Sequence, residues 1–395
     1  MILRRLEVNI KNSYLIFDVE STTHEKGNPY SKYNSLVYCG FKSSVHGYCR
    51  MYREFDRDTI IRLIQEHEFL VTFNGKFDLG WLLRIDIPPE TWYNIKLWDV
   101  QLYHFLHTNQ KNPYPSLNGV AEFYGGPQKF DHIYENYWSK GIDTLDIPKD
   151  ELITYADQDL DVTEFCFLNQ FAERMNSPNK FKLFRVQQED QKVLLEMEYN
   201  GMLLDVKKCV EFDKETQNKI QEIEEQITNL CPYIKGIPFN FDSNDHKSAL
   251  IYGGSIKDSM QVAVGVFKTG ARAGQVKYKK TEFHHDLPRL VDPLPKSELA
   301  KEGYYATNDK ALNSLKPKGP AKKVIQLILS RQKLQKLSGT YFQGFPNILE
   351  RIGWEDNLIH STLNQCKVAT GRLSSDKPNT QNIPPDMKPC FITRF

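Results

Sequence analysis

Long apolar runs are missing from this 395-residue sequence. A membrane-spanning helix needs roughly 18 or more consecutive apolar residues, and no such run occurs. The opening residues, MILRRLEVNIKNSYLIFDVE, also lack the apolar core and cleavage site of a signal peptide. Their apolar positions are interrupted by charges, a pattern typical of strands. These absences argue against a membrane partner and predict a cytoplasmic protein.

Cysteine is scarce and its spacing is wide. The seven cysteines are an odd number and include no CxxC pair. A disulfide framework and a zinc site are both built from closely patterned cysteines, so neither is expected. The pattern predicts reduced thiols scattered through a cytosolic protein.

Length and charge suggest more than one functional region. The chain exceeds the usual size of a single core, so two or three domains are expected. Residues 310–395 contain 14 Lys and Arg against 5 Asp and Glu, a net charge of +9. Because the whole chain carries +1, residues 1–309 carry −8. An acidic N-terminal part and a basic C-terminal part are consistent with a metal site followed by a phosphate-binding surface.

The first part of the chain has the pattern of an α/β domain. Segments rich in β-branched and aromatic residues predict three consecutive strands, and helical spacing then alternates with short apolar strands. This order predicts a mixed sheet. The predicted strands are 14–19, 35–42, 46–53, 69–73 and 96–98, and the predicted helices are 56–67, 76–84, 100–107, 117–124 and 149–171.

The pattern changes at NSPNK, residues 176–180, where we expect a domain boundary. Mostly helical sequence follows, interrupted by a Gly-, Lys- and aromatic-rich stretch that predicts a β-rich insert. The expected elements are helices at 187–199, 206–230 and 321–341, the insert at about 251–305, and a strand at 358–364.

Two carboxylates lie on the first core strand, in the segment FDVE. A strand has a period of two, so Asp18 and Glu20 point to the same face. Two acids on one buried face repel each other unless a cation neutralises them. A solvent-facing edge strand would be the ordinary alternative, but the preceding apolar segment YLIF favours a buried strand.

Two later segments add polar residues. In TFNGKFD, Asn74 is expected to cap a helix, and Asp78 falls in its first turn between apolar neighbours. An ordinary cap followed by an acid that suits the helix dipole is the alternative. In YADQD, Tyr155 and Asp159 are four residues apart and share a helix face. Such a pair is common in helices and indicates little alone.

The order of these motifs is more specific than any one of them. A strand DxE, then NxxFD, then YxxxD resembles the DEDD superfamily of exonucleases, in the subgroup with tyrosine in the third motif. The segment YADQDLDVT is similar to the proofreading exonuclease of DNA polymerase I. The resemblance implies an RNase H-like fold and hydrolysis of DNA from its 3′ ends.

The resemblance also implies roles for the site residues. Two divalent ions, Mg²⁺ or Mn²⁺, suit a site of carboxylates without His or Cys. Asp18 would bridge both ions, Glu20 and Asp159 would complete one site, and Asp78 would support the other. Tyr155 would orient the attacking water, and Asn74 would contact DNA. Phe77 departs from the pattern, because some relatives carry Tyr there.

Later motifs resemble family A DNA polymerases. EMEYNGMLLD is similar to the opening of the thumb, and TGRLSS followed by PNTQNIP resembles the thumb–palm junction of DNA polymerase I-like enzymes. The resemblance implies binding of a primer–template duplex. The residues it assigns are Arg331, Lys333 and Lys336 for phosphates, Arg372 for the minor groove, and Asn379, Gln381 and Asn382 for template or groove edges.

These expectations combine into one organisation. An RNase H-like exonuclease domain would span 1–178, a helical thumb with the insert 179–352, and the start of the palm 353–395. The Gly- and Lys-rich insert is similar to bacteriophage members, which would place the protein in a bacterial host's cytoplasm. The sequence ends before the polymerase catalytic motifs, so we expect no primer extension by this chain alone.

Three functional hypotheses follow. The leading one is the proofreading exonuclease portion of a phage-like family A DNA polymerase, either shortened or naturally split. The second is a DNA-binding subunit of a split polymerase, whose second chain supplies fingers and palm. The third is a free-standing nuclease acting on RNA or on DNA repair intermediates.

Overall fold

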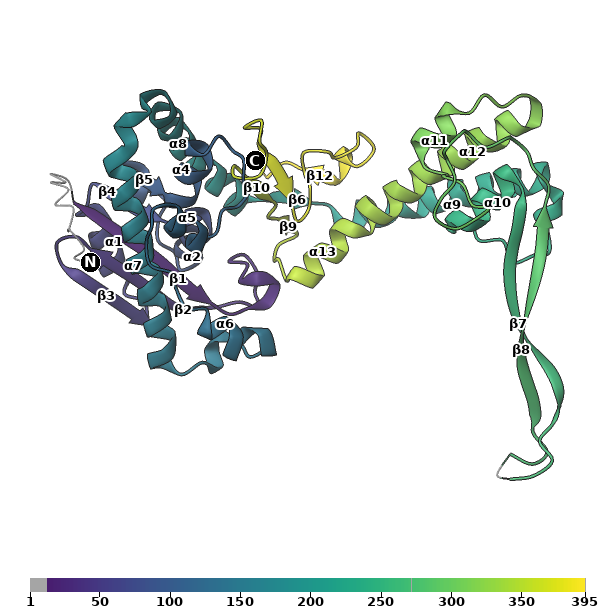
Figure 1. Cartoon of the computed structure of the whole chain (residues 1–395), viewed down its shortest axis with the longest axis horizontal. Helices are drawn as coiled ribbons and strands as arrows, with labels where there is room; N and C mark the ends of the chain where they lie inside the picture. Colours follow the sequence, from purple (N-terminus) through teal and green to yellow (C-terminus); the bar gives the residue numbers. More distant parts are fainter. Residues whose placement is uncertain (1–12, 271, 395) are drawn as a thin grey trace. The chain divides into compact units, whose positions relative to one another are not determined.

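A computed structural model describes residues 13–270 and 272–394 and contains two compact units. The first unit joins the chain up to Val206 with the C-terminal segment from Phe345, and the second unit is Lys207–Gly344. Figure 1 shows the elements of each unit along the chain. The strand expected before Tyr14 falls on residues 1–12, outside the described residues. Within the described ranges, no helix is long and apolar enough to cross a membrane.

A five-stranded mixed sheet forms the centre of the first unit. Its strand order is β3-β2-β1-β4-β5, so β1 is the central strand. The first three strands pair antiparallel, while β1–β4 and β4–β5 pair parallel. The mixed sheet predicted from sequence is confirmed, and the edge-strand alternative for β1 is wrong. The bounds are β1 Tyr14–Ser21, β2 Leu36–Ser43, β3 Gly47–Tyr52, β4 Phe69–Thr72 and β5 Lys96–Asp99.

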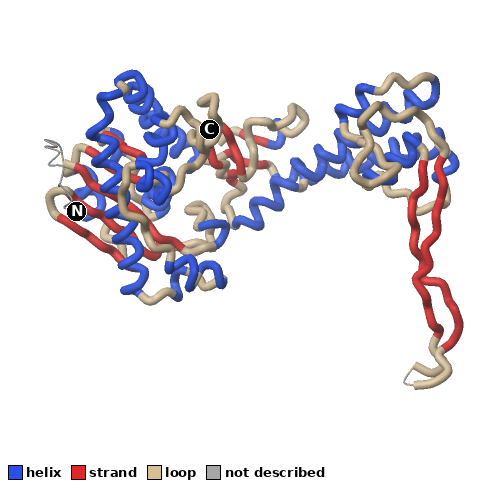
Figure 2. The backbone as a smooth tube through the Cα atoms, in the orientation of Figure 1, coloured by secondary structure: helices blue, strands red, loops and turns tan. Residues whose placement is uncertain are grey.

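Helices cover both faces of this sheet, as the blue and red tubes of Figure 2 show. Leu15 and Phe17 of β1 join one apolar cluster with α1, α2 and α3, whereas Ile16 joins another with α4, α5 and α7. Asp18 and Glu20 have the parity of Ile16 and therefore belong to the α7 side. The helices are α1 Arg57–Gln65, α2 Gly75–Arg84, α3 Glu90–Tyr93, α4 Val100–His107, α5 Leu117–Phe123, α6 His132–Asn136, α7 Lys149–Glu173 and α8 Pro178–Asn200.

The α8 helix begins earlier than predicted and packs within the first unit. Phe184 and Leu195 of this helix are buried in the two clusters that flank the sheet. α8 therefore belongs to the same compact unit as the sheet. The division of the chain into exonuclease, thumb and palm stays a prediction.

The C-terminal segment adds short strands to the same unit. The single strand predicted at 358–364 is wrong, because the chain changes partners within it. β9 (Leu358–Ile359) pairs with β6 (Met202–Leu204), whereas β10 (Thr362–Asn364) pairs with β11 (Ser374–Asp376). The remaining elements are α13 Gly344–Ile352 and β12 Phe391–Ile392, which also pairs with β6.

The second unit is mostly helical and carries one long hairpin. Apolar residues of α9, α10 and α12 form its core together with the base of the hairpin. The predicted β-rich insert is confirmed as this antiparallel pair. The elements are α9 Val206–Leu230, α10 Asn244–Tyr252, β7 Gly254–Val266, β8 Val276–Leu287, α11 Asp309–Ser314, α12 Gly319–Lys336 and a π-helical turn, Leu337–Phe342.

Short 3₁₀ turns connect several of these elements. They are His24–Lys26, Trp138–Lys140, Thr144–Asp146, Arg174–Asn176, Pro232–Ile234 and Lys388–Cys390. The structure describes all seven cysteines and joins none of them in a disulfide.

Candidate active site

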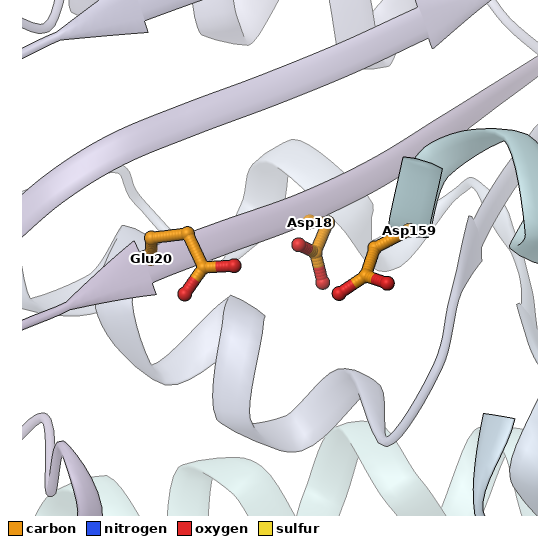
Figure 3. Close-up of side chains that lie close together, drawn as sticks. All are labelled: Asp18, Glu20 and Asp159. Carbon is orange, nitrogen blue, oxygen red and sulfur yellow. The ribbon is translucent and has the colours of Figure 1, made fainter. Parts of the chain in front are cut away.

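Three predicted carboxylates meet beside the central strand. Asp18 and Glu20 come from β1 and Asp159 from α7, and one ligand oxygen from each lies within 4.8 Å of the others. Figure 3 shows the three carboxyl groups turned toward one another. The period of the strand and the packing of α7 against β1 bring them together.

The α7 helix is held firmly where it carries Asp159. Tyr155, Ala156 and Leu160 around it are buried. Neighbouring acids on other faces of the helix pair elsewhere: Asp157 with Arg50 at 2.7 Å and Asp161 with Lys42 at 2.6 Å. Only one acid of this stretch, Asp159, enters the carboxylate group of Figure 3, as the helical spacing predicted.

Asn74 does not cap α2, so that prediction is wrong. Its backbone is left-handed, with φ 62° and ψ 48°, and its side chain makes no capping hydrogen bond. Asp99 caps the helix instead, accepting from the backbone N–H of Gly75 at 2.9 Å. The same carboxylate also caps α4 through the N–H of Gln101 at 2.9 Å. One buried side chain therefore begins two helices.

Asp78 lies in the first turn of α2 and is nearly completely buried, at 2 % exposure. It is not a member of the three-carboxylate group, but burial, followed by the charge of Asp18, raises its pKa. A hydrogen bond with the backbone of Val19 places it beside β1. The structure thus brings three predicted ligands together and puts the fourth next to them.

Burial makes ionisation of these acids costly. Desolvation, followed by the charge of Asp159, raises the pKa of Asp18 to about 8. Desolvation is also the main cause that raises the pKa of Glu20, Asp78 and Asp159 above their ordinary values. A divalent cation would favour the ionised carboxylates and so offset both their burial and their mutual repulsion.

The donor set fits a hard divalent cation. All the candidate ligands are carboxylate oxygens, the type that Mg²⁺ and Mn²⁺ prefer. Asp78 Oδ2 and Asp159 Oδ1 are buried and have no hydrogen-bond partner among the described residues. Orphaned buried oxygens are costly unless something binds them. The cluster of Asp18, Glu20 and Asp159 could therefore hold a metal ion.

Sequence reasoning missed Lys129, whose ammonium enters this site. Its Nζ lies 3.0 Å from Asp159 Oδ2 and 2.8 Å from the Tyr155 hydroxyl. Lys129 belongs to the segment between α5 and α6, where no periodicity exists to indicate its direction. Nothing in the sequence distinguishes it from an exposed lysine.

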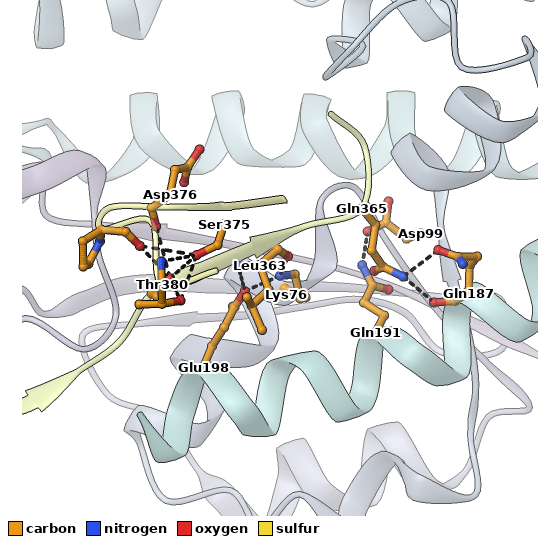
Figure 4. A network of polar contacts seen from close by, with 12 residues as sticks. Lys76, Asp99, Gln187, Gln191, Glu198, Leu363, Gln365, Ser375, Asp376 and Thr380 are labelled. Carbon is orange, nitrogen blue, oxygen red and sulfur yellow. Dashed lines mark hydrogen bonds and ion pairs between the residues drawn. The ribbon is translucent and has the colours of Figure 1, made fainter. Parts of the chain in front are cut away.

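An open cleft of about 510 Å³ lies beside α2. Asn74, Lys76 and Phe77 line one part of it, and His360 and Thr362 of the C-terminal segment line another. Figure 4 shows how Lys76 and Glu198 meet the backbone of Leu363 next to this cleft. Phe77 stands where some relatives of the resembled family carry Tyr, so it offers no hydroxyl to the cleft.

The residues assigned to DNA differ in accessibility. Arg331 is 5 % exposed, and its guanidinium pairs with Glu224 at 2.6 Å and Asp242 at 2.9 Å. These pairs neutralise the Arg331 guanidinium within the protein, so the proposed phosphate contacts do not include it. The others are exposed: Lys333 and Lys336 on α12, and Arg372, Asn379, Gln381 and Asn382 in the C-terminal segment.

Comparisons with known proteins agree with the later motifs. Residues 287–393 match the family model "DNA polymerase family A". DNA polymerase I of Borreliella burgdorferi is 26 % identical over 82 % of this chain and 29 % of its own length. The Helicobacter pylori enzyme is 27 % identical over 84 % and 30 %. These matches support the similarity to DNA polymerase I that the sequence motifs predicted.

A solved structure shares the fold. It is the POL domain of Pol1 from M. smegmatis, in complex with DNA primer-template and dNTP. The similarity covers 96 % of this chain and 55 % of that chain, with a TM-score of 0.62 and 16 % identity. This chain spans about 30 % of the length of the two curated relatives it matches.

Proposed function

We propose that this chain is the part of a family A DNA polymerase that removes nucleotides from DNA 3′ ends and grips the primer–template. The convergence of Asp18, Glu20 and Asp159 at one side of a core strand carries this proposal. The buried orphan oxygen of Asp78 beside them supports a second cation position. An RNase H-like exonuclease domain is the fold class we assign to this region.

Divalent cations would supply a nucleophilic water and charge relief on the leaving oxygen. Asp18, Glu20 and Asp159 would hold one ion, with Asp18 and Asp78 serving the second. Tyr155 would orient the water through its hydroxyl. Burial, followed by the charge of Asp159, raises the pKa of this tyrosine, so it stays protonated and can donate a hydrogen bond.

DNA is the proposed substrate because of the polymerase kinship. The exposed side chains of Lys333, Lys336 and Arg372 would meet the backbone or minor groove, and Asn379, Gln381 and Asn382 would contact groove edges. Asn74, at the cleft, would contact the strand that enters the nuclease site. Three predictions depend on the sequence motifs alone. They are the bacteriophage type, the domain limits, and a second chain that carries fingers and palm.

A nuclease assay tests the proposal. The purified chain is incubated with 5′-labelled single-stranded DNA and Mg²⁺. We expect a ladder of shortened labelled products that disappears with EDTA. Asp18→Ala should lower the rate by several orders of magnitude while leaving the fold intact. Asp150→Ala, an exposed acid in the first turn of α7, should leave the rate unchanged.

The position of the label tests the direction. Hydrolysis from the 3′ end releases a 3′-terminal label as mononucleotide at once, whereas a 5′ label remains on a shrinking oligonucleotide. Intact DNA under all conditions, or activity that Asp18→Ala retains, would contradict the proposal.

A further inference from the structure

We propose that Lys129 is a positioning residue of the carboxylate site, an internal cation that holds Asp159 and Tyr155 and competes with the divalent metal for Asp159. This inference rests on the proposed function, because it concerns the same site. Removing the Lys129 charge should therefore tighten metal binding while it slows hydrolysis.

The Lys129 ammonium directly contacts two side chains of the proposed site. It is 2.8 Å from the Tyr155 hydroxyl, 3.0 Å from Asp159 Oδ2 and 3.8 Å from Asp131 Oδ1. It also lies 4.7 Å from the centre of the Tyr155 ring. A lysine has three donors, and this one directs two of them at adjacent members of the proposed site.

The backbone around Lys129 is fixed from two sides. Asn118, on α5, accepts from the Lys129 N–H at 2.9 Å and donates to the Lys129 carbonyl at 3.3 Å. Gln158, the neighbour of Asp159 on α7, accepts from the N–H of Phe130 at 3.3 Å. The side chain is 17 % exposed. These restraints distinguish Lys129 from a surface lysine whose head samples solvent.

The two carboxylate oxygens of Asp159 have different surroundings. Its Oδ2 accepts from Lys129, while its Oδ1 is buried and has no partner among the described residues. A metal bound through Oδ1 would share the carboxylate with the ammonium. Two cations on one carboxylate repel each other, so Lys129 must weaken metal binding. Burial raises the pKa of Asp159, and the lysine charge opposes that rise, which is consistent with this proximity.

Tyr155 depends on the same contact. The Nζ donates to the phenol oxygen and leaves its proton to point at a water or a carboxylate. Loss of the ammonium would free the hydroxyl to rotate. The expected consequence is a lower rate at saturating metal.

Mn²⁺ titration followed by electron paramagnetic resonance tests the inference without DNA. Lys129→Met removes the charge and keeps the apolar stem, and Lys129→Arg keeps a charge. We expect Lys129→Met to bind Mn²⁺ roughly tenfold more tightly than the natural chain. Lys129→Arg should stay close to the natural affinity. A purely structural lysine would act in the opposite direction, because a distorted site binds metal more weakly.

Single-turnover hydrolysis at saturating Mn²⁺ is the second readout. Lys129→Met should cleave at least tenfold more slowly, and Lys129→Arg should recover most of the rate. Lys129→Gln provides a second neutral variant, compared with the natural chain by circular dichroism, if the Met variant fails to fold. Unchanged or weaker Mn²⁺ binding by the folded neutral variant would overturn the inference.

The outcome separates the two proposals. If the natural chain binds Mn²⁺ and Asp18→Asn abolishes that binding, the metal site stands whatever Lys129 does. If the natural chain binds no Mn²⁺, the proposed function fails and this inference fails with it.

Discussion

Lys76 and Glu198 form a buried ion pair that joins the start of α2 to the C-terminal segment. The Lys76 ammonium contacts Glu198 Oε1 and the carbonyl of Leu363, and the same carboxylate oxygen accepts from the Leu363 N–H at 2.6 Å (Figure 4). Burial raises the pKa of Glu198, and Lys76 opposes that shift. The pair fastens β10 next to the helix that carries Asp78.

Glu198→Ala should destabilise the protein by about 3–5 kcal/mol, because it leaves the Lys76 cation buried without a carboxylate. Chemical denaturation measures the change. Asp190→Ala is the matched control on α8, the helix that carries Glu198, since Asp190 is exposed and its loss should cost no more than about 1 kcal/mol. Equal effects of the two substitutions would show that the buried pair does not stabilise the packing of β10 beside α2.

Stability without metal should fall as pH rises from about 4 to 8. In that range the folded chain keeps a proton on Asp18, whose pKa is about 8, while the unfolded chain has released it at 3.8. The folded state therefore loses its advantage as pH rises through 8. Asp18→Asn should flatten the curve by up to about 1.4 kcal/mol per pH unit.

Urea denaturation in EDTA at several pH values measures this slope. Asp150→Asn, in the exposed first turn of α7, should reproduce the natural slope. Parallel curves for the natural chain and Asp18→Asn would contradict the assigned shift.

Asp99→Ala should cost roughly 2–4 kcal/mol, since it removes the caps of α2 and α4 and the partner of Gln191. Asp56→Ala, which removes the single exposed cap of α1, should cost about 1 kcal/mol. Thermal unfolding of both variants gives the comparison. Equal losses would mean that Asp99 does not serve two helices.

Tyr155→Phe should slow hydrolysis roughly tenfold to a hundredfold, less than the loss of a metal ligand, because only the water-orienting hydroxyl is removed. Mn²⁺ affinity should change little. Tyr137→Phe, which loses a hydroxyl bonded to the exposed Glu151, is the control. A natural rate for Tyr155→Phe would remove this tyrosine from the mechanism.

Local rules predicted the sheet and most of the carboxylate site. The period of two placed Asp18 and Glu20 on one face, and the helical repeat placed Tyr155 with Asp159. Both rules act over a few residues, so they need no knowledge of the distant chain. The convergence of strand and helix came only from the family resemblance.

The remaining features depend on distant parts of the chain. Asp99 replaces Asn74 as a cap because β4 and β5 end side by side. Arg331 is buried because Glu224 and Asp242, which lie 107 and 89 residues earlier, pack onto it. Lys129 reaches Asp159 because Asn118 fixes a loop that has no periodicity. Tertiary contacts decide all three, and sequence spacing does not encode them.

Anomalous diffraction from crystals grown with Mn²⁺ is the most direct test of the metal site. We predict one peak in contact with carboxylate oxygens of Asp18, Glu20 and Asp159, and a second about 3.5–4 Å away, toward Asp78. Asp18→Asn crystals should lose both peaks. Crystals without Mn²⁺ at these side chains, or with it bound only elsewhere on the chain, would contradict the account.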